Sequence, residues 1–281
     1  MIMYDLYPCQ FETLARVELE AAIQRRTQVV PISSDVVLAR VLTRYKMFLR
    51  TSDLGFGCHV MMDGYWEIWL TRFLARTLQP GMRVIDVEAN FGYYTMLMAD
   101  IVGSAGAVIA VEPNPDTAAL LLRSVQLNGY AGYTEVLQAA LGAEDAESAQ
   151  FFAPDGEPKN AAIGGAHGRA GQEMTVPVTC LDKIAGRWGP IDFIKIDAEG
   201  SEEAIIAGMG SVLANSPPAM VLEFNAHRGN DPRGLLSRLL AVYGKVAEIG
   251  FDSALVPVTA DTLLTSCPGE DRLLYFSLDR G

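Results

Sequence analysis

The sequence has few basic residues relative to its acidic ones. Only 22 lysines and arginines stand against 34 aspartates and glutamates, which gives a formal net charge of -12. A surface with this charge repels DNA and RNA, because binding a polyanion needs clustered Lys and Arg. We therefore expect no nucleic acid among the partners of this chain.

Paired cysteines and long apolar runs are also missing. The four cysteines, Cys9, Cys58, Cys180 and Cys267, form no CxxC pair. Their spacing argues against a structural zinc site or a redox centre and predicts free thiols in a reducing compartment. No apolar run approaches the roughly 20 residues that cross a bilayer, and the N-terminus lacks the pattern of a secretory signal. We expect a cytoplasmic protein with no membrane partner.

Apolar spacing divides the chain near residue 80. Residues 81–281 alternate short apolar strands with helices, which is typical of a mostly parallel sheet covered on both faces. Residues 1–80 are predicted to form a helical extension, with amphipathic helices over 11–26, 35–50 and 66–78. The predicted fold class is therefore α/β, a doubly wound, Rossmann-like sheet that follows an N-terminal helical extension.

Two neighbouring strand ends carry the residues expected to bind a cofactor. Ligands of a doubly wound sheet bind beyond the carboxyl ends of its strands. VIDVEANFGYYT ends a strand at Asp86 and provides Gly92, where the backbone can approach a ligand closely. VIAVEPNP ends the next strand at Glu112, and a carboxylate there can accept both hydroxyls of a ribose.

The cofactor predicted for this site is S-adenosylmethionine. The absence of GxGxxG argues against a dinucleotide and hence against an NAD-dependent oxidoreductase. The acidic residues of DxExNxG suit a cationic sulfonium with an ammonium group better than a phosphate. The predicted cofactor-binding residues are Asp86, Glu88, Asn90, Gly92, Tyr93, Glu112, Pro113, Asn114 and Ala140.

These segments resemble the FkbM-type methyltransferases, which methylate hydroxyls of natural products and sugars. The resemblance runs from about Asp63 to the C-terminus and rests on DGYWEIWLTRFLARTLQPGMRVIDVEANFGYYT, VIAVEPNP, TCLDKI and DFIKIDAEGSEEAIIAG. Of these blocks, KIDAEGSE is the most specific. The resemblance implies a seven-stranded sheet with its last strand antiparallel, S-adenosylmethionine as methyl donor, and O-methylation. It leaves the small-molecule, natural-product or sugar acceptor open.

One position departs from the family pattern. The first motif is usually D-x-G-A-N, and Glu88 stands where that glycine leaves space for the methionine part of the cofactor. A glutamate there could intrude and weaken binding, could turn aside, or could pair with the cofactor's ammonium group. The first outcome would make this chain a non-catalytic, degenerate member of the family, which is the alternative to an active enzyme.

Methyl transfer to a hydroxyl needs a positioned acceptor and a base beside it. KIDAEGSEE places Lys195, Asp197 and Glu199 at alternate positions, which face the same side of a strand. LEFNAHRG ends the next strand with Glu223 and His227, and an imidazole with a pKa of about 6.5 is a natural base. The predicted catalytic residues are Asp197, His227 and Lys195, and the predicted substrate contacts are Glu67, Asn160, Glu199 and Glu223.

The sequence alone leaves three points open, namely a metal site, the role of one Gly-rich stretch and the role of the N-terminal helices. The carboxylates of Asp197, Glu199 and Glu223 could hold a divalent ion such as Mg²⁺, but their spacing is no metal motif, and we assign no metal ligand. Residues 142–178 are predicted to be irregular, with short strand-like pieces such as AQFFA and EMTVPV. The Gly-rich stretch 157–169 inside this segment is either a lid over the acceptor or a plain loop. The N-terminal helices could cap the cofactor site or pair two subunits in a homodimer.

Overall fold

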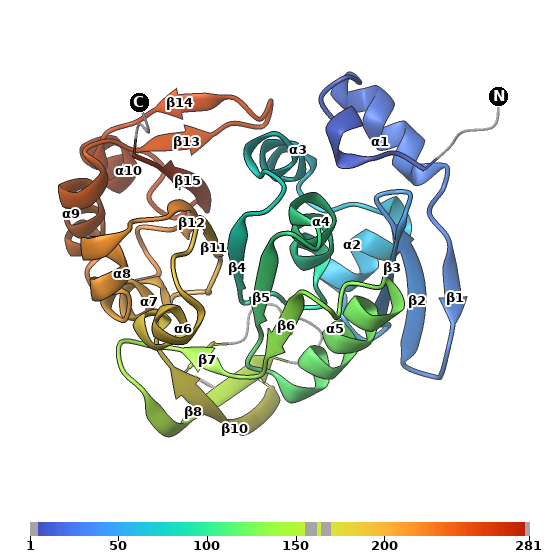
Figure 1. The fold of residues 1–281 in the computed structure, drawn as a ribbon, viewed down its shortest axis with the longest axis horizontal. Coiled ribbons are helices and arrows are strands. Elements are labelled where there is room, and N and C mark those ends of the chain that lie inside the picture. The colour runs from blue at the N-terminus through green and yellow to red at the C-terminus, as the bar shows by residue number, and fades with distance from the viewer. Residues whose placement is uncertain (1–4, 155–161, 164–169, 279–281) are drawn as a thin grey trace.

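A twisted, mostly parallel sheet forms the centre of the molecule (Figure 1). The computed structural model describes residues 5–154, 162–163 and 170–278. Within these residues the sheet has eight strands, in the order β14 (Leu255–Pro257), β13 (Ala247–Ile249), β15 (Arg272–Phe276), β12 (Ala219–Phe224), β11 (Phe193–Ile196), β4 (Arg83–Val87), β5 (Ala107–Val111) and β6 (Thr134–Leu137).

The strand directions confirm the predicted fold class. The five strands from β6 to β12 run parallel, and β15 returns antiparallel between β12 and β13. The last strand is therefore antiparallel, as the family resemblance implies. The short edge strand β14 pairs with β13, so the described sheet has eight strands instead of the seven that the family resemblance implies.

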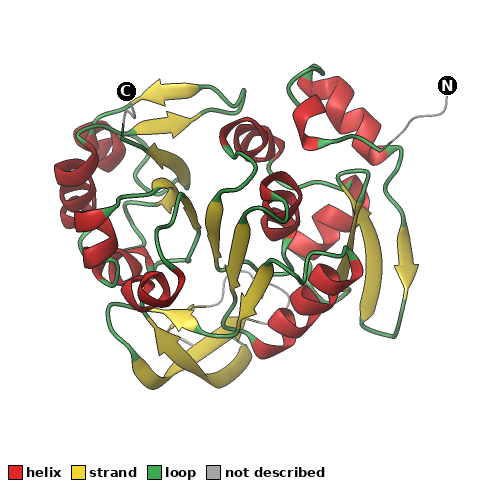
Figure 2. Cartoon of the chain, in the orientation of Figure 1, coloured by secondary structure: helices red, strands yellow, loops and turns green. Residues whose placement is uncertain are grey.

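Helices cover both faces of this sheet (Figure 2). Alternate residues of each central strand face opposite sides, so Val84 of β4 belongs to one hydrophobic cluster and its neighbour Ile85 to the other. One face packs against α3 (Ile68–Thr77), α4 (Tyr93–Val102) and α5 (Pro115–Leu127). The other packs against α6 (Leu181–Trp188), α7 (Glu202–Ala207), α8 (Gly210–Asn215), α9 (Pro232–Tyr243) and α10 (Ala260–Thr265).

Local signals explain how the helices at the sheet edge begin and end. The side chain of Asn114 caps α5 by accepting hydrogen bonds from the backbone N–H groups of Asp116 and Thr117. The helical segment that follows β11 is divided into two short helices, α7 and α8. It breaks at Gly208, where a Cβ would collide with the carbonyl oxygen of Gly142.

The N-terminal extension is only partly helical. Its helical elements are a 3₁₀ turn η1 (Pro8–Gln10), α1 (Arg16–Gln24) and α2 (Phe56–Asp63), followed by α3. Between α1 and α2 lies an antiparallel sheet of β1 (Val29–Pro31), β2 (Val36–Val41) and β3 (Tyr45–Arg50). The helix predicted over residues 35–50 is therefore wrong, because this segment is a β-hairpin.

The hairpin follows from residue type and from the turn. Side-chain burial along β2 alternates with a period of two, and its valines are β-branched, which favours a strand. Leu42 and Thr43 both have positive φ in the turn, as tight hairpins prefer. The apolar residues of this segment fit both the 3.6-residue period of a helix and the two-residue period of a strand. Their spacing alone therefore could not distinguish the two structures.

The segment predicted to be irregular contains two long strands. β8 (Ala146–Pro154) pairs antiparallel with β10 (Gly171–Thr179), and β7 (Ala140–Leu141) and β9 (Ala162–Ile163) complete a second sheet. Most of the Gly-rich stretch 157–169 lies outside the described residues, so its role as a lid stays a prediction.

One hydrophobic cluster joins the extension to the central sheet. Leu19, Met47 and Leu49 of the extension share it with Leu97 of α4 and Leu121 of α5. The backbone N–H of Phe48 also donates a hydrogen bond to Ser124 Oγ on α5, at 3.0 Å. No helix of the described chain has the length and apolar character to cross a bilayer.

Because the core is shared, we expect the extension and the sheet to unfold together. Leu49 is fully buried, so Leu49→Ala should lower the free energy of unfolding by about 2–5 kcal/mol. Denaturant unfolding followed by both far-UV circular dichroism and tryptophan fluorescence should show one coincident transition. Val30→Ala, at an exposed residue of β1, is the control and should change stability little. Two separate transitions would contradict a shared core.

Candidate active site

A row of acidic residues lies at the carboxyl edge of the sheet. Strand pairing places four residues in one register across β5, β4, β11 and β12, namely Val111, Val87, Ile196 and Leu222. The residue that follows each of them is acidic: Glu112, Glu88, Asp197 and Glu223. Neighbouring strands are about 4.8 Å apart, so the sheet itself brings these four carboxyl groups side by side.

A cavity of about 270 Å³ opens beside this row. Its acidic lining consists of Glu67, Glu88, Glu112, Asp197, Glu199, Glu223 and Asp271. Aromatic side chains form much of the remaining wall, namely Phe56, Trp66, Tyr93, Tyr94 and Phe151. Within the described residues, Lys195 is the one cationic side chain that lines the cavity. Such a site favours a cationic ligand over a phosphate.

Lys195 lines the cavity and lies close to the carboxyl groups of Asp197 and Asp86. Its Nζ lies 3.3 Å from Asp197 Oδ2 and 3.9 Å from Asp86 Oδ1. Burial alone would lower the pKa of Lys195, but the carboxylates of Asp197, Asp86 and Glu67 outweigh it and raise the pKa. Lys195 therefore stays charged and holds Asp197 in place.

Asp86 lies beneath the cavity and does not line it. Its carboxylate is completely buried, and Oδ2 accepts a hydrogen bond from Thr95 Oγ1 at 2.6 Å. The predicted direct contact of Asp86 with a cofactor is thus replaced by an indirect role, because Asp86 positions Lys195.

Glu112 connects the loops that follow β4 and β5 through hydrogen bonds to both. Its two carboxylate oxygens accept hydrogen bonds from the backbone N–H groups of Asn90, at 2.9 Å, and Asn114, at 2.8 Å. Each oxygen keeps a second lone pair for a ligand hydroxyl. Burial raises the pKa of Glu112 to about 7, and the two N–H donors oppose that rise.

Glu88 has a left-handed backbone, with φ of 53°. A residue with a Cβ pays roughly 1–2 kcal/mol for this conformation, which gives a physical reason for glycine at this position in relatives. The carboxyl group of Glu88 lines the cavity, and burial together with the charge of Glu112 raises its pKa well above the usual range.

Arg228 forms ion pairs with three of the cavity acids, a role that no signal in the sequence indicates. Nη1 lies 2.9 Å from Glu199 Oε2 and 2.5 Å from Glu223 Oε2, and Nη2 lies 2.9 Å from Asp271 Oδ2. Arg228 is the residue after His227, so only the path of the loop after β12 decides which of the two reaches the acids.

His227 does not reach the cavity. The loop turns at Asn225, whose Oδ1 accepts from the backbone N–H of His227 and whose Nδ2 donates to Asp271. This turn directs Arg228 towards the acids and leaves the His227 side chain exposed. The prediction of His227 as a general base is therefore not supported by its position.

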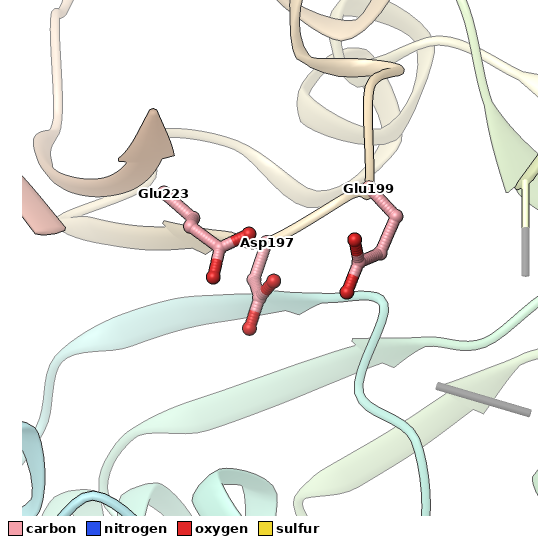
Figure 3. A group of neighbouring side chains, drawn as sticks. All are labelled: Asp197, Glu199 and Glu223. Atoms are coloured by element: carbon pink, nitrogen blue, oxygen red, sulfur yellow. The ribbon is translucent and has the colours of Figure 1, made fainter. Parts of the chain in front are cut away.

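The carboxylates proposed as alternative metal ligands do come together. Figure 3 shows Asp197, Glu199 and Glu223 pointing towards one another from the tips of β11 and β12. One oxygen of each lies within 4.8 Å of the others. The Arg228 guanidinium contacts two of the three, so a divalent ion would have to displace it, and we assign no metal ligand here.

The other predicted residues fall into two groups. Asn90, Tyr93 and Glu67 line the cavity, and Glu67 Oε2 accepts a hydrogen bond from Tyr94 at 2.7 Å. The remaining cofactor candidates are not part of its lining: Gly92, Pro113, Asn114 and Ala140. Gly92 and Asn114 are the N-cap residues of α4 and α5, and Ala140 begins β7. Asn160 lies outside the described residues.

The N-terminal extension contributes directly to the wall of the cavity. Phe56 of α2 makes edge-on ring contacts with Trp66, at 5.4 Å, and with Tyr93, at 6.3 Å. The Lys195 Nζ lies 5.0 Å from the centre of the Tyr94 ring. Of the two roles predicted for the extension, the structure places Phe56, Trp66 and Glu67 at the site, and pairing of two subunits stays a prediction.

Comparison with known proteins gives the family. The sheet is mostly parallel, with β15 antiparallel between β12 and β13. A family model described as the methyltransferase FkbM domain matches residues 86–249. The chain belongs to the FkbM methyltransferase family.

Individual relatives match shorter stretches. A protein-L-isoaspartate O-methyltransferase of Aeropyrum pernix is 41% identical over 59 residues, which are 21% of this chain and 23% of the relative. Protein-L-isoaspartate O-methyltransferase 1 of Arabidopsis thaliana is 32% identical over 76 residues, or 27% of this chain and 33% of the relative. The matched stretches thus span a third or less of these curated relatives. A solved FkbM methyltransferase of Methylobacillus flagellatus KT is 17% identical over 72% of this chain and 45% of that one, with a TM-score of 0.46.

The raised pKa of Glu112 predicts a pH-dependent stability. The folded chain keeps the Glu112 proton up to a pKa of about 7, whereas the unfolded chain loses it near the ordinary value of 4.5. The folded state therefore binds more protons in this window, so the contribution of Glu112 to the free energy of unfolding falls as the pH rises through it. The melting temperature of Glu112→Gln, measured from about pH 5 to 8, should decline less steeply than that of the native chain.

Glu147→Gln, which alters an exposed carboxylate on β8, should keep the native slope and serves as the matched control. An unchanged slope in Glu112→Gln would show that Glu112 is not the group that binds this proton.

Proposed function

We propose that this chain is an S-adenosylmethionine-dependent O-methyltransferase that acts on a hydroxyl of a small molecule, natural product or sugar. The observation that carries the proposal is the pair of carboxyl groups, Glu112 and Glu88, on neighbouring strand tips beside an acidic cavity. Membership of the FkbM family supports methyl transfer as the reaction class.

The cavity residues fit this cofactor. Glu112 retains lone pairs that can accept ribose hydroxyls, and the excess of carboxyl groups favours a sulfonium and an ammonium over the phosphates of a dinucleotide. When bound, S-adenosylmethionine supplies an activated methyl group. The same acidity favours an uncharged or cationic acceptor and disfavours nucleic acid.

Asp197 is the residue best placed to take the proton of an acceptor hydroxyl. It ends β11 at the cavity, and the charged Lys195 holds its Oδ2 at 3.3 Å. A base in this position typically contributes about 10²–10⁴-fold to the rate. Glu199 and Glu223, fixed by Arg228, are then available to contact the acceptor.

A cytoplasmic location and a homodimer remain part of this proposal. The free state of Cys9, Cys58, Cys180 and Cys267 is consistent with a reducing compartment. The apolar faces of the extension are the surfaces that could pair two copies.

Calorimetric titration tests the proposal directly. S-adenosylmethionine and S-adenosylhomocysteine should each give saturable heat, and NADH should give none. Glu112→Ala should weaken binding by about 10-fold or more, because a ligand hydroxyl loses its buried acceptor. Asp197→Asn should keep its affinity for S-adenosylhomocysteine within about threefold and lose turnover with any hydroxyl acceptor found.

The exposed-site variant Glu147→Ala controls for a general effect of removing charge. Absence of binding by the native chain, or binding of NADH instead, would contradict the proposal.

A further inference from the structure

We propose that Glu88 is the residue that recognises the amino-acid end of the cofactor, through a charge-assisted hydrogen bond between its carboxylate and the α-ammonium group. This assignment rests on the proposed function. It makes Glu88 a specificity determinant that separates the complete cofactor from adenosyl compounds without an amino group.

The backbone fixes where the Glu88 carboxyl group can go. The N–H of Ala89 donates to Val111 O on β5 at 2.9 Å, and the N–H of Asn90 donates to Glu112. Glu88 and Asn90 both have positive φ, at 53° and 51°. This tight turn holds the Glu88 side chain at the cavity, at a cost in backbone strain that a purely structural side chain would not need.

Among the residues that the structure describes, Glu88 differs from the other acids of the cavity in having no hydrogen-bond or ion-pair partner. Lys195 pairs with Asp197, and Arg228 pairs with Glu199, Glu223 and Asp271. Glu67 accepts from a tyrosine and Glu112 from two backbone N–H groups. No described residue makes a hydrogen bond or an ion pair with the Glu88 carboxyl group.

The charges nearest to Glu88 make a cationic ligand favourable. The acids that act on it are Glu112, Asp197, Glu202 and Glu199, all of the same sign. A carboxylate held among carboxylates is destabilised, and a bound cation reverses that penalty. The ligand group that fits must be cationic and must donate hydrogen bonds, which an ammonium does and a sulfonium does not.

The order of the strand tips is consistent with the order of groups in the cofactor. Glu112 on β5 is proposed to hold the ribose, and Asp197 on β11 to face the acceptor. Glu88 directly follows β4, which lies between β5 and β11 in the sheet. The amino-acid end of a ligand anchored at Glu112 therefore has the Glu88 carboxylate as its nearest unpaired anion.

Comparing two ligands separates this role from a general effect on the pocket. S-adenosylhomocysteine carries the amino acid, and 5′-methylthioadenosine lacks it. Glu88→Gln keeps the side-chain size and removes the charge, so it should weaken S-adenosylhomocysteine binding by about 10–100-fold. Binding of 5′-methylthioadenosine should change by less than about twofold. Glu67→Gln, at a cavity acid that already has a partner, is the matched control and should affect both ligands alike.

Glu88→Gly provides the second test, because it relieves the positive φ and also opens space. A gain in S-adenosylhomocysteine affinity for Glu88→Gly would show that Glu88 obstructs the site. Equal losses for both ligands, or no loss in Glu88→Gln, would likewise overturn the assignment while leaving the proposed function standing. Failure of the native chain to bind either ligand would overturn the proposed function itself.

Discussion

Mutual repulsion among acidic groups is the constraint that the site is built around. A parallel sheet aligns its strand tips about 4.8 Å apart, and here four adjacent tips each continue into Glu or Asp. Neighbouring cationic side chains and backbone N–H groups then compensate most of the acids at this edge of the sheet. Lys195 forms ion pairs with Asp86 and Asp197, and Arg228 forms ion pairs with Glu199, Glu223 and Asp271. Two backbone N–H groups donate hydrogen bonds to Glu112.

Within the described part of the chain, this arrangement leaves the Glu88 carboxyl group without a compensating partner. Glu88 lies in the middle of the row, on a strained backbone, and burial together with the charges of Glu112, Asp197, Glu202 and Glu199 raises its pKa. A folded chain tolerates such a cost at positions where a ligand offsets it. The cofactor assignment and the special role of Glu88 therefore follow from the same imbalance of charge.

Much of the fold could be predicted from the sequence, because it depends on local signals. The runs RVIDV and AVIAV are short, apolar and followed by acidic residues, so both the strands and the positions of Glu88 and Glu112 could be inferred. The hairpin over residues 36–50 could not, because its apolar run satisfies two periodicities at once. For β8 and β10 the sequence indicated only the short strand-like pieces AQFFA and EMTVPV, because glycine, proline and polar residues surround them and obscure the full length and pairing of the strands.

The site was harder to predict where a loop decides the outcome. His227 and Arg228 are neighbours in the sequence, and the turn formed by Asn225 directs Arg228, instead of the predicted His227, towards the acids. Phe56 and Trp66 come from the extension, and only tertiary packing brings them to strand tips that follow later in the chain. No periodicity in the sequence encodes such a contact.

A crystal structure with S-adenosylhomocysteine tests the central claim most directly. The account predicts the ribose hydroxyls within hydrogen-bond distance of Glu112 and the α-ammonium beside the Glu88 carboxylate. Density for the ligand elsewhere on the molecule, or a Glu88 side chain that fills the space of the amino-acid end, would contradict it.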